Sequence, residues 1–173
     1  MKLRQFVLTS LTLFIAVWSF SQTNNLANVW FFGNNASLDF NTPTPTVGTG
    51  PIDTQEGVAT ICDPSGNLLF FSDGLTAWDN TNTPMPQGNG LAGHWSSTQA
   101  AIIIPNPGNT DQFYIFTLES IDYFTNPGLS YSLVDMTLPG NGTVGSPLGD
   151  VVLAEKNIAL ATSVVEKLTA VRK

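Results

Sequence analysis

The sequence has very little of the residue types on which most active sites depend. Its 173 residues include one cysteine and one histidine. With Cys62 alone, the chain cannot form an intrachain disulfide. With His94 alone, it cannot build a metal centre from several histidines, and a Ser-His-Asp triad would depend entirely on that residue. We therefore expect a structural or incidental role for His94, and we predict no catalytic, metal-binding or cofactor-binding residue.

Positive charge is also scarce. The chain has six Lys and Arg against 13 Asp and Glu, and residues 5–155 contain neither Lys nor Arg. A surface that binds nucleic acid or anionic lipid needs clustered cations, which replace the counterions of the phosphates. The sequence therefore predicts no nucleic-acid partner, and it leaves cations, sugars and other proteins as the classes of ligand.

Apolar runs are short, and the longest stands at the N-terminus. It extends from Phe6 to Trp18, follows the basic residues Lys2 and Arg4, and precedes small residues that end at Ser21. This order of basic, apolar and small residues is that of a signal peptide. Because a membrane span needs about 20 apolar residues, we do not expect an integral membrane protein. Residues 1–21 are predicted to be a signal peptide cleaved after about Ser21, which places the protein outside the cell or at its surface.

Turn residues are abundant and separate many short apolar runs. Gly, Pro, Asn, Asp, Ser and Thr interrupt the chain about every ten residues, and the runs between them are rich in Val, Ile, Phe, Trp and Tyr. This pattern is typical of short antiparallel strands, so an all-β protein is predicted. Long polar loops are expected at 41–54 and 80–97. The predicted strands are 28–33, 57–62, 67–72, 75–79, 99–104, 112–118 and 129–136.

Two predicted hairpins follow the same plan. In the first, strands at 58–62 and 68–71 flank a turn at 63–67, where Gly66 can supply a positive φ. In the second, strands at 101–104 and 113–116 flank the loop 105–111. The first strands begin 43 residues apart, at Val58 and Ala101. That spacing matches the blades of a β-propeller, which are four-stranded sheets of about 40 to 50 residues, although hairpins of an ordinary sandwich could match as well.

The C-terminal stretch has two readings from its pattern. After Gly149 the chain has neither Gly nor Pro, and apolar residues recur at helical spacing. Its many β-branched residues favour extended chain instead. We predict strands at about 150–155 and 167–172, with a helix as the alternative.

Short motifs follow one another in order from the first predicted strand to the C-terminus. They are Asn-Val-Trp-Phe-Phe-Gly at 28–33, Glu-Gly-Val-Ala-Thr at 56–60, Gly-Asn-Leu-Leu-Phe-Phe-Ser-Asp-Gly at 66–74, Ser-Ser-Thr-Gln at 96–99, Tyr-Ser-Leu-Val-Asp-Met at 131–136 and Glu-Lys-Leu-Thr-Ala-Val at 166–171. Together these motifs resemble the N-terminal β-propeller (WD40-like) region of Bacteroidota secreted surface proteins, described as gliding-motility-associated or linked to type IX secretion.

The resemblance implies a fold and a class of function. The fold would be a partial β-propeller of about two to three four-stranded antiparallel blades, with residues 22–173 as the N-terminal part of the propeller domain and a next blade beginning near the C-terminus. The function would be that of a non-enzymatic surface or secreted module, commonly followed by repeat domains and a sorting domain. We therefore expect a fragment of a larger multidomain protein that binds other proteins or polysaccharide.

Two alternatives stay open at this point. The chain could be the first part of a glycan-hydrolysing propeller enzyme, which needs two carboxylates set several ångströms apart, or it could be a non-functional truncated product. The acidic residues near predicted strand ends are Asp39, Asp53, Glu56, Asp73, Asp79, Glu119 and Asp122. Because Asp73-Gly74 and Asp63-Pro64 are common turn sequences, we expect those two carboxylates to accept backbone hydrogen bonds.

A few further residues could bind a ligand. Asn106, Asn109 and Asp111 offer oxygen atoms for calcium, but their spacing differs from the twelve-residue calcium loop, so solvated turn residues are expected. The strand alternation predicts that the aromatic run 30–32 packs in the core, and Cys62 is expected to be a buried small apolar residue. Trp95, which lies among polar loop residues, is the candidate ligand-binding residue.

Overall fold

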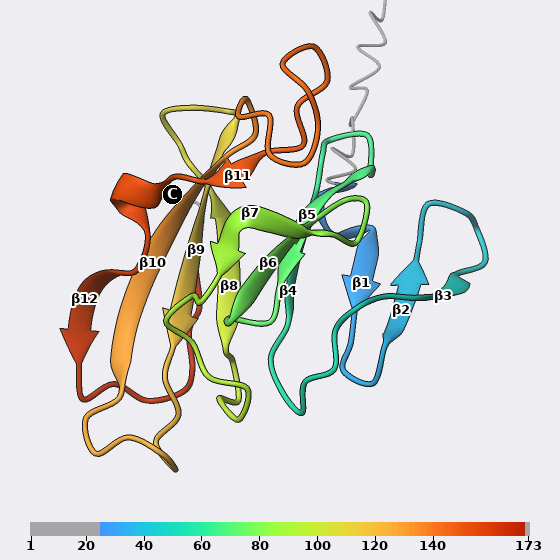
Figure 1. The fold of residues 1–173 in the computed structure, drawn as a ribbon. Coiled ribbons are helices and arrows are strands. Elements are labelled where there is room, and N and C mark those ends of the chain that lie inside the picture. The colour runs from blue at the N-terminus through green and yellow to red at the C-terminus, as the bar shows by residue number, and fades with distance from the viewer. Residues whose placement is uncertain (1–24, 172–173) are drawn as a thin grey trace, which may run out of the picture.

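Short strands and tight turns form three antiparallel sheets in residues 25–171, the part of the chain that the computed structural model describes (Figure 1). None of the sheets closes on itself. The predicted signal peptide, 1–21, lies outside the described residues. The all-β prediction is confirmed, and the arrangement is that of a partial, open β-propeller.

Sheet 1 has three strands in the order β1-β2-β3, and a short 3₁₀ helix, η1, precedes it. Sheet 2 has four strands in the order β4-β5-β6-β7. The bounds are η1 Asn25–Ala27, β1 Val29–Phe31, β2 Ala36–Asp39, β3 Thr46–Thr49, β4 Ala59–Cys62, β5 Leu68–Ser72, β6 Thr76–Asp79 and β7 Pro84–Asn89.

Sheet 3 has five strands. Strands β8, β9 and β10 follow one another, and the free side of β10 pairs with β11 near its C-terminal end and with β12 near its start. A second 3₁₀ helix, η2, lies between β11 and β12. The bounds are β8 Ala101–Pro105, β9 Gln112–Leu118, β10 Gly128–Asp135, β11 Asp150–Val151, η2 Leu153–Glu155 and β12 Ile158–Thr162.

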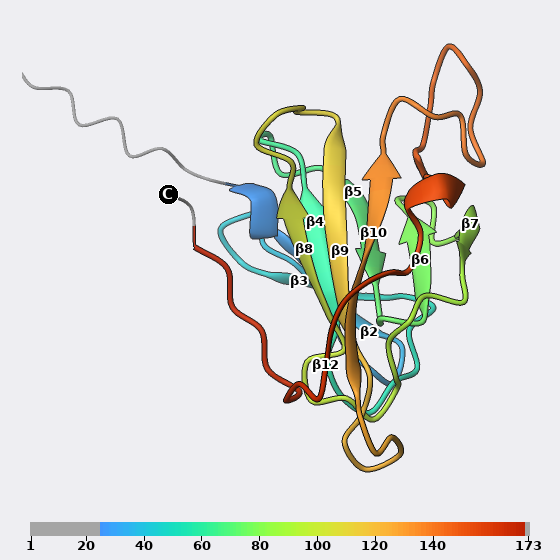
Figure 2. The same cartoon turned by 90° about the vertical axis from the view of Figure 1, so that its left-hand side faces the viewer.

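The first strands of the three sheets lie next to one another, as they do around the axis of a propeller. Strand β4 contacts β1 on one side and β8 on the other, and Figure 2 shows β4 beside β8. Sheet 2 therefore lies between the other two sheets. Both of its faces are covered, which is how successive blades bury their apolar side chains.

Side-chain alternation along β5 supplies both cores. Phe70 points into the core shared with sheet 3, where its ring meets Phe113 edge to face at 5.5 Å. Phe71 points the other way and stacks on Phe31 of sheet 1 and on Trp78. Successive side chains of a strand face opposite sides, so this one strand ties the three sheets together. Burial of each large apolar side chain stabilises the fold by about 1.5–3 kcal/mol.

The seven strands predicted with clear apolar runs are confirmed, and so are the two hairpins. In the first hairpin the amide of Gly66 donates to the Asp63 carbonyl at 2.9 Å, and Gly66 has a φ of 90°. Cys62 is completely buried, as expected.

Other expectations were wrong. The loops predicted at 41–54 and 80–97 contain β3 and β7, and β2 was also missed. Strand β7 begins with Pro84 and contains Gly88, which suggest a loop, but it lies at the edge of sheet 2, where a missing N–H is tolerated.

The positions predicted for the C-terminal strands were also wrong. The predicted strand at 150–155 is only the two-residue β11 followed by η2, and β12 lies further on. The strand predicted at 167–172 is not observed, since residues 164–171 pair with no described strand. Residue 172 lies outside the described part. Figure 2 shows this segment turning at the lower end of the sheets and running back upward. The helix considered as the alternative is absent from the described part, apart from the single turn of η2.

Candidate functional site

Trp95 lies in a group of aromatic side chains made by two loops. One loop, 90–100, joins β7 to β8, and the other, 119–127, joins β9 to β10. Both lie at the lower end of the sheets in Figure 1. We call His94, Trp95, Tyr123 and Phe124 the aromatic loop cluster.

The rings of this cluster contact one another around His94. The His94 ring lies 4.6 Å from that of Tyr123, 5.3 Å from Trp95 and 5.7 Å from Phe124, measured between centroids. Trp95 and Tyr123 are 5.5 Å apart. Three of the side chains are well exposed, Trp95 at 37%, Tyr123 at 58% and Phe124 at 41%, and so is the neighbouring Ile121. Exposed apolar groups gathered in one place are typical of interaction sites.

Hydrogen bonds fix the loop that carries Trp95. The amide of Ser96 donates to Nδ1 of His94 at 3.2 Å, and the amide of Ser97 donates to the His94 carbonyl at 3.0 Å. From the loop between β3 and β4, the Thr54 hydroxyl donates to the Trp95 carbonyl at 3.2 Å. In the second loop the amides of Tyr123 and Phe124 both donate to the Ser120 carbonyl. The cluster is therefore held in one arrangement.

Glu166 joins the two loops. Its Oε2 accepts hydrogen bonds from the amide and the hydroxyl of Thr98, at 2.9 and 3.0 Å, and its Oε1 accepts from the amide of Ile121 at 2.6 Å. The side chain is buried. Burial raises the pKa of the carboxyl, but the hydrogen bonds from Thr98, Ile121 and the Ser120 hydroxyl outweigh that effect and lower the pKa below its ordinary value of 4.5. Glu166 is thus held as a carboxylate that fixes both loops.

The loops around the aromatic loop cluster contain acidic residues and no Lys or Arg. The three loops are 50–58, 90–100 and 119–127. Residues 164–171, which include the bracing residue Glu166, contain one basic residue, Lys167. The carboxylates in these loops are Asp53, Glu56, Glu119 and Asp122.

The sequence pointed to Trp95 but not to its neighbours. Tyr123, Phe124 and Glu166 were missed because they come from segments distant in the chain that only the packing of sheet 3 brings together. An adjacent aromatic pair inside the turn-rich segment 119–127 was the available signal. Single apolar residues in loops are common, so that signal was weak.

Three of the seven acidic residues near strand ends, Asp39, Asp73 and Asp79, cap turns. Asp73 accepts from the amides of Leu75 and Thr76, and Asp63 accepts from the amides of Ser65 and Asn67, as the turn sequences predicted. Burial raises the pKa of Asp73 against the effect of those bonds. Hydrogen bonds from Asn67 lower the pKa of Asp63. Glu119 accepts from the amide of Gly128 at 2.8 Å.

The loop considered for calcium shows the same turn chemistry. Asn106 accepts from the amide of Gly108, and Asn109 accepts from the amide of Asp111. Within residues 25–171, no group of three His, Cys, Asp or Glu side chains is placed to hold a metal ion. The side-chain oxygens of Asn106 and Asn109 are therefore already used within the loop.

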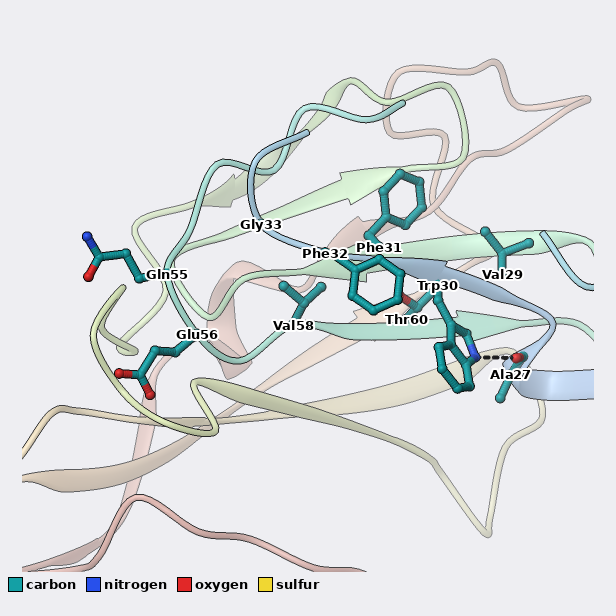
Figure 3. Close-up of a pocket in the computed structure, with 10 residues that line it drawn as sticks. All are labelled: Ala27, Val29, Trp30, Phe31, Phe32, Gly33, Gln55, Glu56, Val58 and Thr60. Carbon is teal, nitrogen blue, oxygen red and sulfur yellow. Dashed lines mark hydrogen bonds between the residues drawn. The ribbon is translucent and has the colours of Figure 1, made fainter. Parts of the chain in front are cut away.

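The aromatic run of β1 differs from its prediction. Only Phe31 is buried, whereas Trp30 is 46% and Phe32 40% exposed, because alternation sends Trp30 to the outer face of sheet 1 and Phe32 follows the end of the strand. Trp30 lies 5.0 Å from Phe40, between ring centroids. Trp30 and Phe32 also border an open hollow of about 470 Å³ that lies between β1 and the start of β4 (Figure 3).

This outer face differs in kind from the aromatic loop cluster. It is a sheet surface, and in this fold sheet surfaces stack on one another. The outer face of sheet 3 is similar, with the half-buried rings of Tyr114, Phe116 and Tyr131 in mutual contact. The aromatic loop cluster lies at the end of the sheets, where loops carry ligand-binding residues.

No family model matches the chain, and neither a curated protein nor a solved structure matches it. The resemblance to Bacteroidota surface proteins therefore stays a prediction. Within the described residues, no helix is both long and apolar enough to cross a membrane.

Proposed function

We propose that this chain is an exported, non-enzymatic interaction module, part of a larger surface protein of the gliding-motility-associated or type IX secretion-linked kind, and that it binds a protein or polysaccharide partner through the aromatic loop cluster. The observation that carries the proposal is the exposure of Trp95, Tyr123 and Phe124 on loops that hydrogen bonds hold in place. Exposed apolar side chains gathered in one place are typical of a surface that binds a partner. Fixed loops lower the entropic cost of that binding.

The non-enzymatic part of the proposal is supported by what the acidic side chains do. Asp63, Asp73, Asp79, Glu119 and Glu166 accept hydrogen bonds from nearby amides, so their oxygens already stabilise the fold. A glycan-hydrolysing site needs two free carboxyl groups that face each other across the scissile bond. Asp53, Glu56 and Asp122 are exposed on loops, and Glu56 borders the open hollow beside Trp30 and Phe32.

The test compares Trp95→Ala with Trp30→Ala in binding to purified cell-envelope material. Both substitutions remove an exposed indole, one from the aromatic loop cluster and one from the outer face of sheet 1. We expect Trp95→Ala to abolish retention on the envelope material and Trp30→Ala to keep it. Equal retention of both variants and the unchanged chain would contradict the assignment of the site. Glycan turnover that fails on an Asp122→Asn substitution would contradict the non-enzymatic function.

A further inference from the structure

The arrangement of the rings, together with the charge around them, narrows the ligand class. We infer that the aromatic loop cluster binds an uncharged polysaccharide, an inference that rests on the proposed function and deepens it. The argument uses the mutual tilt of the rings, the absence of cations from the surrounding loops, and the Glu166 brace.

The rings present several faces rather than one flat platform. The planes of His94 and Trp95 are inclined by 35°, those of His94 and Tyr123 by 34°, and those of Trp95 and Tyr123 by 57°. The ring face of an aromatic side chain carries partial negative charge, which attracts the polarised C–H groups on the face of a sugar. Successive sugars of a twisted chain turn relative to one another, so inclined rings can contact more than one of them.

The charges favour an uncharged chain over an anionic one. Asp53 is exposed next to Thr54, whose hydroxyl donates to the Trp95 carbonyl, and Asp122 is exposed next to Tyr123. Carboxylates are strong acceptors for sugar hydroxyl groups. They repel uronic acids and sulfated sugars, and Lys167 is the one cation in residues 164–171, the described part of the segment that carries Glu166.

A protein partner fits the cluster less well. A stable protein interface buries about 800 Å² on each side, and the core of such an interface is poor in charged residues. Around the aromatic loop cluster, an interface of that size would extend over the carboxylate-bearing loops. A polysaccharide needs only the rings and a few acceptors, so it matches the cluster as it stands.

The brace explains how this surface is ready for a ligand. Glu166 connects Thr98, in the loop that carries Trp95, to Ile121, in the loop that carries Tyr123. Because the two loops are fixed relative to each other before binding, a ligand does not have to order them. Glu166 is therefore a positioning residue of the site and does not need to touch the ligand.

The experiment is native affinity electrophoresis of the purified chain in gels that contain one polysaccharide each. The neutral probes are β-glucan, xylan, mannan and starch, and the anionic probes are alginate and polygalacturonate. We expect at least one neutral polysaccharide to retard the chain. Trp95→Ala and Tyr123→Ala should each weaken that binding about tenfold or more, and Trp30→Ala should leave it unchanged. Circular dichroism and thermal unfolding of each variant verify that it is folded.

The outcomes separate the inference from the proposed function. Retardation by anionic polysaccharides alone would overturn the inference. If no polysaccharide retards a folded chain, the inference is also overturned, and a photo-crosslinking residue in place of Tyr123 then decides the proposed function. The same crosslinking residue in place of Trp30 is the control. A protein that crosslinks at position 123 and not at position 30 would support the proposed function with a protein as the partner. If neither position 123 nor Trp95 affects any binding, both are wrong.

Discussion

The rings of Phe31 and Phe71 stack with their centroids 3.9 Å apart and their planes inclined by 13°. Phe31 belongs to β1 and Phe71 to β5, so this contact joins sheet 1 to sheet 2. The ring of Trp78 also stacks on Phe71, at 5.5 Å between centroids. The apolar junction between the first two sheets is therefore built around one fully buried ring.

The first prediction concerns that ring. Phe71→Ala should lower the free energy of unfolding by about 3–5 kcal/mol, because it removes a fully buried aromatic side chain and leaves a cavity between the sheets. The measurement is urea denaturation followed by circular dichroism. Phe32→Ala is the matched control, since Phe32 is 40% exposed and its loss should cost less than about 1 kcal/mol. Similar losses for the two variants would show that the sheets do not pack through Phe71.

The second prediction concerns Glu166. Glu166→Gln replaces a carboxylate oxygen with an amide group, which cannot accept from the amide of Ile121 or Thr98. The expected loss is about 1–3 kcal/mol. Asp122→Asn removes a charge from the same end of the molecule, where the side chain is exposed, and should have little effect on stability.

The loss should also depend on pH. The folded pKa of Glu166 lies below its ordinary value of 4.5, so the unfolded chain takes up the proton first as pH falls. The stabilisation is therefore fully present above that ordinary value and disappears as pH falls through the folded pKa. Thermal unfolding at about pH 7 and about pH 3 should show a larger difference between Glu166→Gln and the unchanged chain at the higher pH. A difference that is equal at both would rule out a carboxylate brace.

The sequence predicts this fold best where apolar runs are uninterrupted. For β9, the predicted bounds 112–118 are those observed, because the strand alternates buried and half-buried side chains over seven residues. Strand β12 was not predicted, because all five of its residues are exposed and its strand character comes from pairing with β10. A strand that depends on its neighbour leaves little trace in its own composition.

The candidate site was predictable only in part, for a related reason. Trp95 could be singled out because it is a large apolar residue in a polar loop. Its contacts with Tyr123 depend on where β9 and β10 place the 119–127 loop, and the brace depends on a segment still further along the chain. Turns such as the one at Asp63 can be predicted from local sequence, but contacts between distant segments cannot.

The third prediction concerns the thiol of Cys62. The residue is completely buried at the end of β4, and desolvation raises the pKa of the thiol above its ordinary value of 9.0, against smaller effects from the Val29 and Asn28 backbone. The native chain should therefore react very slowly with Ellman's reagent at about pH 8, since the thiolate is the nucleophile. One thiol per chain should react at once in guanidinium chloride. Rapid reaction under native conditions would contradict the burial of Cys62.

The last prediction concerns Asp79, which ends β6 and is fully buried. Its Oδ1 accepts from the amide and hydroxyl of Thr81, and its Oδ2 accepts from the side chain of Asn141 at 2.8 Å. Desolvation raises the pKa of this carboxyl, but the hydrogen bonds outweigh that effect and lower the pKa below its ordinary value, so Asp79 stays ionised. Because Asn141 also donates to the Pro84 carbonyl at 2.9 Å, it ties the long loop before β11 to sheet 2.

A double-mutant cycle isolates that tie. Asp79→Ala should cost at least about 1–3 kcal/mol, since it leaves the donors of its turn without an acceptor. Asn141→Ala should cost less, and the double variant should be more stable than the sum of the two losses predicts, with a coupling of about 1 kcal/mol. Asp53→Ala, at an exposed loop position, is the control and should change the free energy of unfolding by less than about 0.5 kcal/mol. Additive losses at Asp79 and Asn141 would mean that the two side chains do not interact, and that apolar packing alone holds the loop against sheet 2.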